Sequence, residues 1–145
     1  PGQVVIAGQK DAVERAAAAC KAAGAKMAVA LPVSVPSHCA LMKPAADKLA
    51  VALNDVQFNT PTITVINNVD VASPTSADDI KDALVRQLYC PVRWSETVEL
   101  MAQKGITQLV ECGPGKVLTG LAKRINKSLS AQAVNDVASL AALTE

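Results

Sequence analysis

Apolar and polar residues follow two periods along the chain, and the two periods alternate. Apolar residues recur at every third or fourth position in five segments, which predicts helices over 11–23, 41–53, 76–89, 94–105 and 117–125. Short apolar or β-branched runs predict buried strands over 3–7, 26–33, 62–69 and 107–112. Because strands alternate with helices, we expect an α/β layered fold with mostly parallel strands.

Residues with special backbone preferences mark several ends of these elements. Asp11 and Ser76 are suited to cap the helices that follow them. Gly24 is a plausible helix stop, and Pro44 fits only the first turn of its helix. The tail over 128–145 is rich in Ala and Ser, and we expect it to hold one strand and one short helix.

The opening of the chain looks like half of a larger unit. A strand, a helix and a strand before Pro36 make up half of a split β-α-β unit, so we expect its other half upstream of Pro1. The chain also starts without an initiator Met, which suggests a cut end. We therefore expect two domains, one over residues 1–33 and one over 34–145.

Composition narrows the class of protein. The 145 residues are half apolar but include only three aromatics, so Ala, Val, Leu and Ile must fill the core. A net charge of +1 gives no reason to expect nucleic acid. No apolar run approaches the roughly 20 residues of a membrane span, and no signal peptide is visible. The four cysteines lack a CxxC spacing, so we expect reduced thiols in a cytoplasmic protein.

His38 is the only histidine and the best candidate for chemistry. It follows a predicted strand, and α/β enzymes place reacting groups in such loops. Imidazole titrates near neutral pH and suits a general base. Its neighbours Ser37 and Cys39 are poor partners because adjacent side chains diverge, and the chain has no Gly-x-Ser-x-Gly elbow. The residues alone predict half of a catalytic site, or else a capping or surface histidine.

Two further motifs favour structural roles. The glycines of residues 113–116 are two apart and Val117 follows the lysine, so the Walker pattern fails and a strand-to-helix turn is predicted. Asp78, Asp79 and Asp82 lie at the start of a helix, where they favour the helix dipole rather than a metal. We expect no metal site.

A basic run lies on or after the helix predicted over 117–125. Lys123 and Lys127 are four residues apart and share a face. Such a run is usually a solvated face, but it can also meet an acidic partner by electrostatic steering. The run comprises Lys116, Lys123, Arg124 and Lys127.

Five strings, in this order and spacing, resemble the malonyl-CoA:acyl carrier protein transacylases of bacterial fatty acid biosynthesis. Together they cover almost the whole chain, and the tail after Asn126 matches least. The strings are Pro-Gly-Gln-Val-Val-Ile-Ala-Gly over 1–8, Val-Ser-Val-Pro-Ser-His-Cys-Ala-Leu-Met over 33–42, Asn-Asn-Val-Asp over 67–70, Gln-Leu-Tyr with Pro-Val-Arg-Trp over 87–94, and Glu-Cys-Gly-Pro-Gly-Lys-Val-Leu over 111–118.

The resemblance implies the fold. Family enzymes are about twice this length, with an α/β-hydrolase-like acyltransferase domain into which a ferredoxin-like subdomain is inserted. Residues 1–33 would then be the second half of the ferredoxin-like subdomain. Residues 34–145 would be the C-terminal part of the α/β-hydrolase-like domain, and the N-terminal half would be missing.

The resemblance also implies the mechanism. A serine in a Gly-His-Ser-x-Gly elbow attacks malonyl-CoA, and the phosphopantetheine thiol of acyl carrier protein then attacks the malonyl-serine ester. His38 matches the catalytic base. A backbone carbonyl at the position of Gln87 orients it, in place of the carboxylate of the usual triad. The serine lies outside this chain, so we expect the chain alone to be inactive.

Two binding surfaces follow from the same resemblance. Val35, Pro36 and Ser37 precede the histidine, where related enzymes select the acyl group, and they match the malonyl-using form. Lys123 and Arg124 match positions expected to meet the acidic acyl carrier protein, and Lys26 is a weaker candidate. No cofactor is implied beyond malonyl-CoA as substrate and the phosphopantetheine of the carrier protein.

Two alternatives remain open on the sequence. The chain could be a non-catalytic acyltransferase-like module that binds acyl carrier protein, or part of the acyltransferase domain of a polyketide synthase. Sequence upstream of Pro1 discriminates among the three hypotheses. A serine elbow favours an active transferase, its absence favours the non-catalytic module, and a ketosynthase favours the synthase.

Overall fold

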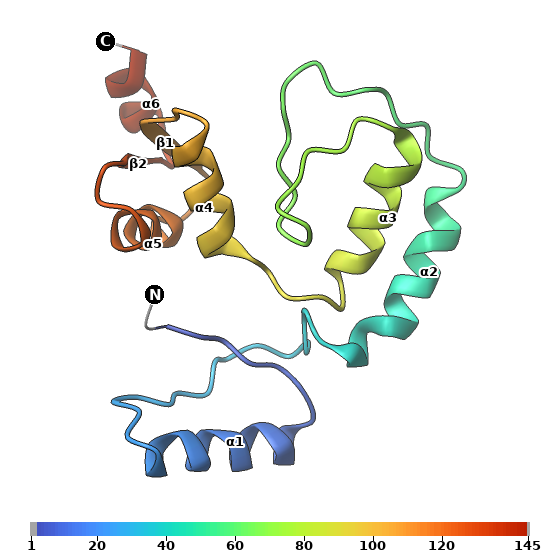
Figure 1. Cartoon of the computed structure of the whole chain (residues 1–145), viewed down its shortest axis with the longest axis vertical. Coiled ribbons are helices and arrows are strands. Elements are labelled where there is room, and N and C mark those ends of the chain that lie inside the picture. The colour runs from blue at the N-terminus through green and yellow to red at the C-terminus, as the bar shows by residue number, and fades with distance from the viewer. Residues whose placement is uncertain (1–2, 145) are drawn as a thin grey trace. The chain divides into compact units, whose positions relative to one another are not determined.

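The computed structural model describes residues 3–144, which form two compact units over 3–92 and 93–144. The expected boundary between residues 33 and 34 stays a prediction. In chain order the elements are α1 (Lys10–Ala22), a short 3-10 helix (Ala40–Met42), α2 (Lys43–Leu53), α3 (Ala77–Gln87), α4 (Trp94–Gln103), β1 (Gln108–Cys112), α5 (Val117–Ile125), β2 (Ser130–Val134) and α6 (Val137–Thr144) (Figure 1).

The predicted helices are confirmed within a few residues at each end. Ser76 caps α3 as expected, since its hydroxyl oxygen accepts a hydrogen bond of 3.1 Å from the Asp79 N–H. Gly24 follows α1 with a φ of 95°, a conformation that glycine adopts without strain. The predicted cap at Asp11 is wrong, because α1 begins one residue earlier and Asp11 lies in its first turn.

Residues 93–144 form a small α/β unit. Strands β1 and β2 pair in parallel, from Gln108 opposite Ser130 to Cys112 opposite Val134, and α5 connects them. Helices α4 and α6 pack against α5 and β2 respectively. Their core is made of small residues, as the composition requires, and includes the fully buried Val98. The other buried residues are Thr97, Ala122, Leu129 and Ala131.

In residues 3–92, the contact between α2 and α3 provides the described core. Ala46 of α2 and Ala83 of α3 are 1% and 4% exposed. Because alanine side chains are short, they allow the two helix backbones to approach closely. Leu53 and Val69 are also buried in this unit. Among residues 3–144, no helix has the length and apolar character that crossing a bilayer requires.

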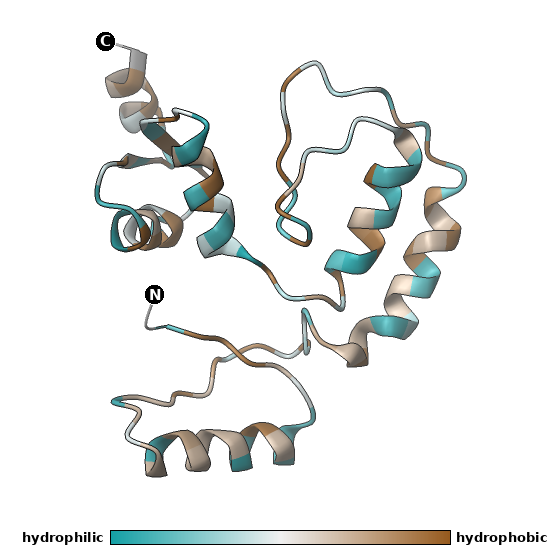
Figure 2. Cartoon of the chain, viewed as in Figure 1, coloured by the Kyte–Doolittle hydropathy of each residue, from teal (hydrophilic) through white to brown (hydrophobic). Residues whose placement is uncertain are grey.

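Three predicted strands are wrong: residues 3–7, 26–33 and 62–69 are not strands in the described structure. Each runs outside any described sheet, and a strand exists only where a neighbour accepts and donates its backbone hydrogen bonds. Most of their apolar residues are exposed to solvent, although Val69 is buried. Figure 2 shows the hydrophobic residues of the segment near the N-terminus. The largest exposed fractions are those of Val4 (86%), Met27 (78%), Val29 (69%), Val33 (71%) and Ile63 (79%).

These exposed segments predict the behaviour of the 145-residue chain in isolation. We expect it to self-associate and to enhance the fluorescence of the dye ANS, which binds exposed apolar surface. Replacing Met27, Val29 and Leu31 by Ser should lower this fluorescence, whereas Ala12→Ser and Ala18→Ser on exposed positions of α1 should not. A wild-type chain that is monomeric and does not enhance ANS fluorescence would contradict this expectation.

Candidate active site at His38

The backbone of His38 is held in an uncommon conformation. His38 has a φ of 63°, in the left-handed region that few residues other than glycine adopt. Its N–H donates a hydrogen bond of 2.9 Å to the carbonyl oxygen of Leu88. This bond ties the loop that carries the histidine to the segment that follows α3, 50 residues further along the chain.

The side chain of His38 makes a second bond to the same segment. Its Nδ1 atom lies 2.8 Å from the carbonyl oxygen of Gln87, the last residue of α3. A carbonyl oxygen only accepts hydrogen bonds, so Nδ1 must carry the proton. The neutral ring then has its lone pair on Nε2, which makes Nε2 the atom able to act as a base. The residue is exposed, so this atom can meet a reacting group.

The end of α3 suits a histidine that must accept a proton. The last carbonyl groups of a helix lack partners within the helix and carry partial negative charge. After α3, the Arg86 carbonyl accepts from Tyr89 and Cys90, while the Gln87 and Leu88 carbonyls accept from His38. The ring therefore contacts the partly negative end of α3, and its described partner is a backbone carbonyl rather than a carboxylate.

The contact to Gln87 uses the backbone of that residue. Its side-chain Nε2 is 3.4 Å from the carbonyl oxygens of both Cys90 and Pro91, which are long hydrogen bonds. The side chain therefore supports the turn after α3 but makes no described contact with the imidazole. The role of Gln87 in orienting His38 stays a prediction, for which this geometry gives a physical basis.

The predicted acyl-selecting residues lie in a tight turn just before His38. The Ser37 N–H donates to the Val35 carbonyl oxygen at 2.9 Å, and the Cys39 thiol donates to the Pro36 carbonyl oxygen at 3.1 Å. Val35 is half exposed and Ser37 is exposed. The turn places these residues directly before the histidine, and their role in acyl selection stays a prediction.

The predicted docking residues are exposed in the two units. Lys26 belongs to the unit over 3–92, whereas Lys123 and Arg124 lie in the last turn of α5 in the unit over 93–144. Arg124 donates from Nε to the Gly120 carbonyl oxygen at 3.3 Å, and Lys123 is exposed. Cations in a last turn are favoured by the helix dipole, so their position alone does not identify a partner.

The first turn of α5, which follows the glycine turn, binds a carboxylate of the chain itself. Glu111 of β1 accepts from the N–H of Leu118 (3.1 Å) and from both the N–H and the hydroxyl of Thr119 (2.7 Å each). Desolvation acts to raise the pKa of Glu111, but these hydrogen bonds outweigh it and hold the pKa below its usual value. The turn is thus a structural strand-to-helix connection, in agreement with the failed Walker pattern.

One cluster near the site was missed by sequence reasoning. Asp82 was interpreted only as a helix-dipole residue, yet it pairs with Arg86 Nε at 2.6 Å. Arg86 also pairs with Asp70, and the hydrogen bonds to Asp70 and then Asp82 raise its pKa further above the usual range. The spacing of four residues between Asp82 and Arg86 could have signalled the helical pair. Asp70 belongs to the string over 67–70 that carries the resemblance, but no spacing pairs it with Arg86.

Comparison with known proteins identifies the family of the chain. The acyl transferase domain family matches residues 1–144. The chain belongs to the acyl transferase domain family. Its fold mixes helices with a parallel pair of strands.

Several relatives are similar to the chain over all or nearly all of its length. The chain is 66% identical to the malonyl CoA-acyl carrier protein transacylase of Escherichia coli (strain K12), over 100% of this chain and 47% of the relative. A crystal structure of an acyl carrier protein S-malonyltransferase from Vibrio cholerae has a TM-score of 0.90 at 67% identity, covering 94% of this chain and 44% of that one. The chain thus spans about half the length of the curated relatives it matches.

A third relative is a complex. A malonyl-transacylase in complex with a type II PKS acyl-carrier protein has a TM-score of 0.91 and 66% sequence identity, covering 92% of this chain and 43% of that one. The matches therefore extend to a transacylase solved together with a carrier protein.

The backbone nature of the Gln87 contact predicts a contrast between two variants of the full-length polypeptide. Gln87→Ala keeps the carbonyl and should leave kcat for acyl transfer within roughly twofold. His38→Ala removes the imidazole that we expect to act as the base, and it should lower kcat by about 10²–10⁴-fold. Steady-state kinetics would check this, and equal losses in the two variants would show that the Gln87 side chain matters instead.

Proposed function

We propose that this chain is the C-terminal half of an enzyme that transfers malonyl from malonyl-CoA to acyl carrier protein in fatty acid biosynthesis. The observation that carries the proposal is the orientation of His38, whose Nδ1 is bound to the Gln87 carbonyl so that Nε2 is left as a base. The identity of 66% to the Escherichia coli transacylase over the whole chain supports this activity. The serine nucleophile belongs to the other half of the polypeptide.

The first half-reaction forms an ester. Nε2 of His38 takes the proton of the serine hydroxyl while the serine oxygen attacks the thioester carbonyl of malonyl-CoA. The tetrahedral intermediate collapses, the bond from the carbonyl carbon to sulfur breaks, and the coenzyme A thiolate leaves with a proton from Nε2. The Gln87 carbonyl keeps its bond to Nδ1–H throughout, and the end of α3 favours the transient imidazolium.

The second half-reaction regenerates the serine. Nε2 takes the proton of the phosphopantetheine thiol, whose sulfur attacks the malonyl-serine ester. The bond from the carbonyl carbon to the serine oxygen breaks, and Nε2 returns the proton to that oxygen. The products are malonyl-acyl carrier protein and the free enzyme, with no added cofactor.

We propose that the finer architecture follows the same family. Residues 1–33 would be the second half of a ferredoxin-like subdomain, and residues 34–145 the C-terminal part of an α/β-hydrolase-like domain. The exposed apolar residues of segments 3–7, 26–33 and 62–69 support this, because strands supplied by the other half would bury them. We place the enzyme in the cytoplasm.

Acyl carrier protein is the proposed protein partner. Lys26, Lys123 and Arg124 would meet its acidic surface, while Val35, Pro36 and Ser37 would line the malonyl pocket. The relative solved with a type II PKS carrier protein supports a second candidate, in which the same malonyl transfer supplies a polyketide carrier.

Intact-mass spectrometry tests the proposed activity. The full-length polypeptide incubated with malonyl-CoA should gain the mass of one malonyl group, and His38→Ala should slow this gain by about 10²-fold or more. The isolated 145-residue chain should gain none, because it lacks the nucleophile. A malonyl adduct on the isolated chain would contradict the proposal.

Charge reversal tests the docking residues. Lys123→Glu with Arg124→Glu should raise KM for acyl carrier protein about tenfold or more, because steering of an acidic partner is lost. Formation of the malonyl-serine ester should not change, since that step does not involve the carrier protein. Lys104→Glu, at an exposed lysine outside α5, is the matched control; an unchanged KM in the double variant would refute the docking site.

A further inference from the structure

We propose that Asp70 and Arg86 are positioning residues that hold the end of α3 where the Gln87 carbonyl meets His38. The inference rests on the proposed function, because it assigns the two residues a part in the same reaction. The two residues act on the histidine through the backbone of α3.

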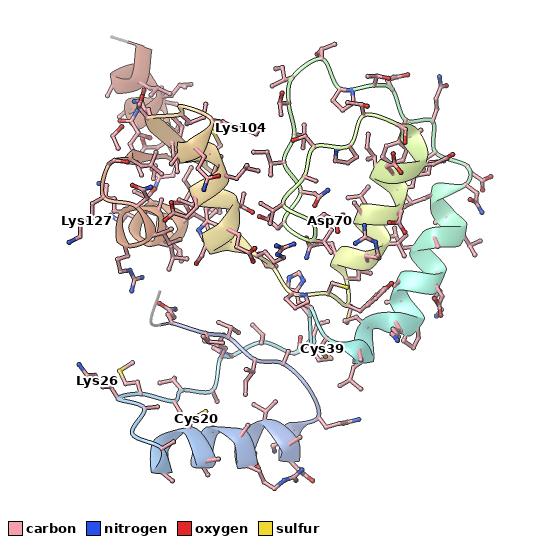
Figure 3. The ribbon with its side chains drawn as sticks, in the orientation of Figure 1. Cys20, Lys26, Cys39, Asp70, Lys104 and Lys127 are labelled. Carbon is pink, nitrogen blue, oxygen red and sulfur yellow. The ribbon has the colours of Figure 1, made fainter. Side chains whose placement is uncertain are left out.

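The ion pair between Asp70 and Arg86 is bidentate. Nη1 and Nη2 of Arg86 each donate to one carboxylate oxygen of Asp70, both at 2.7 Å. The remaining edge of the guanidinium donates from Nε to Asp82 at 2.6 Å, one turn earlier on α3. Figure 3 labels Asp70 beside this helix. Two parallel bonds and a third at Nε fix both the plane and the direction of the guanidinium.

Asp70 is presented by a turn of defined shape. The N–H of Asn67 donates to the Ala72 carbonyl oxygen at 2.9 Å, and the N–H of Asp70 donates to Asn67 Oδ1 at 2.8 Å. Val71 has a φ of 58°, a strained conformation for a β-branched residue. Such strain persists only where the surroundings hold it, so residues 67–72 form an anchor rather than a pliable loop.

Arg86 is joined by one peptide unit to Gln87, so holding Arg86 in place also holds the carbonyl that binds His38. Its own carbonyl accepts from the N–H groups of Tyr89 (3.1 Å) and Cys90 (2.8 Å), which closes the turn after α3. The next carbonyl along the chain, that of Gln87, accepts from His38. A shift of the Arg86 backbone would therefore move the acceptor of the histidine bond.

The expected sizes of the effects on rate and on stability distinguish positioning of the histidine from stabilisation of the fold. The side chains of Arg86 and Asp70 are 30% and 37% exposed, and ion pairs that contact water contribute little to global stability. A displacement of about 1 Å at a catalytic group can cost on the order of 10²-fold in rate. Loss of the pair should thus appear in kcat well before it appears in the melting temperature.

The test measures ester formation from malonyl-CoA in variants of the full-length polypeptide. Asp70→Asn and Arg86→Lys should each lower the rate constant by about ten- to one hundredfold, with KM for malonyl-CoA unchanged. Asp82→Asn is the matched control, since it weakens only the bond within α3 and keeps the bidentate pair. It should stay within roughly twofold of wild type.

A double-mutant cycle separates positioning from general damage. In a His38→Ala background, Asp70→Asn should have no further effect, because the pair acts only through the histidine. An equal further loss in that background would overturn the proposal, as would wild-type rates for Asp70→Asn in the intact site.

Hydrogen exchange gives a readout that does not need activity. The His38 N–H is bound to the Leu88 carbonyl, and its protection should fall in Asp70→Asn but persist in Asp82→Asn. Unchanged protection in Asp70→Asn would overturn the proposal even if the enzyme were inactive. A wild-type polypeptide that forms no malonyl ester would instead contradict the proposed function, and the exchange result would still decide the role of the pair.

Discussion

A single hydrogen bond of 2.8 Å, from Nδ1 of His38 to the carbonyl oxygen of Gln87, joins two segments 49 residues apart. It fixes which ring nitrogen carries the proton, and thereby which one can remove a proton from a nucleophile. A carbonyl remains an acceptor at every pH, so this orientation does not depend on the ionisation of another side chain. A carboxylate would offer more charge to an imidazolium, and here only the partial charge of a helix end is available.

That bond can exist only if α3 ends where it does. Ser76 satisfies the first turn of the helix, and His38 uses two of the carbonyls left at its end. Packing of Ala83 in the core shared with α2 sets the lateral position of the helix. The ion pair between Arg86 and Asp70 acts on the same terminal turn. The cap, the core packing and the ion pair of α3 therefore together determine the position of the Gln87 carbonyl oxygen.

Local signals in the sequence predicted the helices well, because caps, stops and apolar periods are properties of neighbouring residues. They also located His38, since a lone histidine after an apolar run is visible in one dimension. The three wrong strands share a physical cause. Their apolar pattern is typical of strands that are buried against neighbouring elements, and no described strand pairs with them. The contact with Gln87 could be predicted only through resemblance. Every residue has a backbone carbonyl, so the residue type does not show which carbonyl binds the histidine.

The positions of the Arg86 side chain and its partner were not predictable for a related reason. Asp82 lies one helical turn away and could be inferred from spacing, whereas Asp70 comes close only through the strained turn at Val71. A β-branched residue such as Val71 in the left-handed region cannot be anticipated from its type, because such residues rarely adopt this conformation. The position of the Arg86 side chain thus depends on a local pair with Asp82, which the sequence shows, and on a tertiary pair with Asp70, which it does not.

The most direct test of the central claim is the tautomer of His38 in the full-length polypeptide. Nitrogen-15 NMR of labelled histidine distinguishes a protonated Nδ1 from a protonated Nε2, and the His38→Gln variant identifies the signal by its loss. The account predicts that the neutral ring carries its proton on Nδ1, bound to the Gln87 carbonyl. A neutral ring protonated on Nε2 would contradict it, because the atom assigned as the base would then have no lone pair to accept a proton.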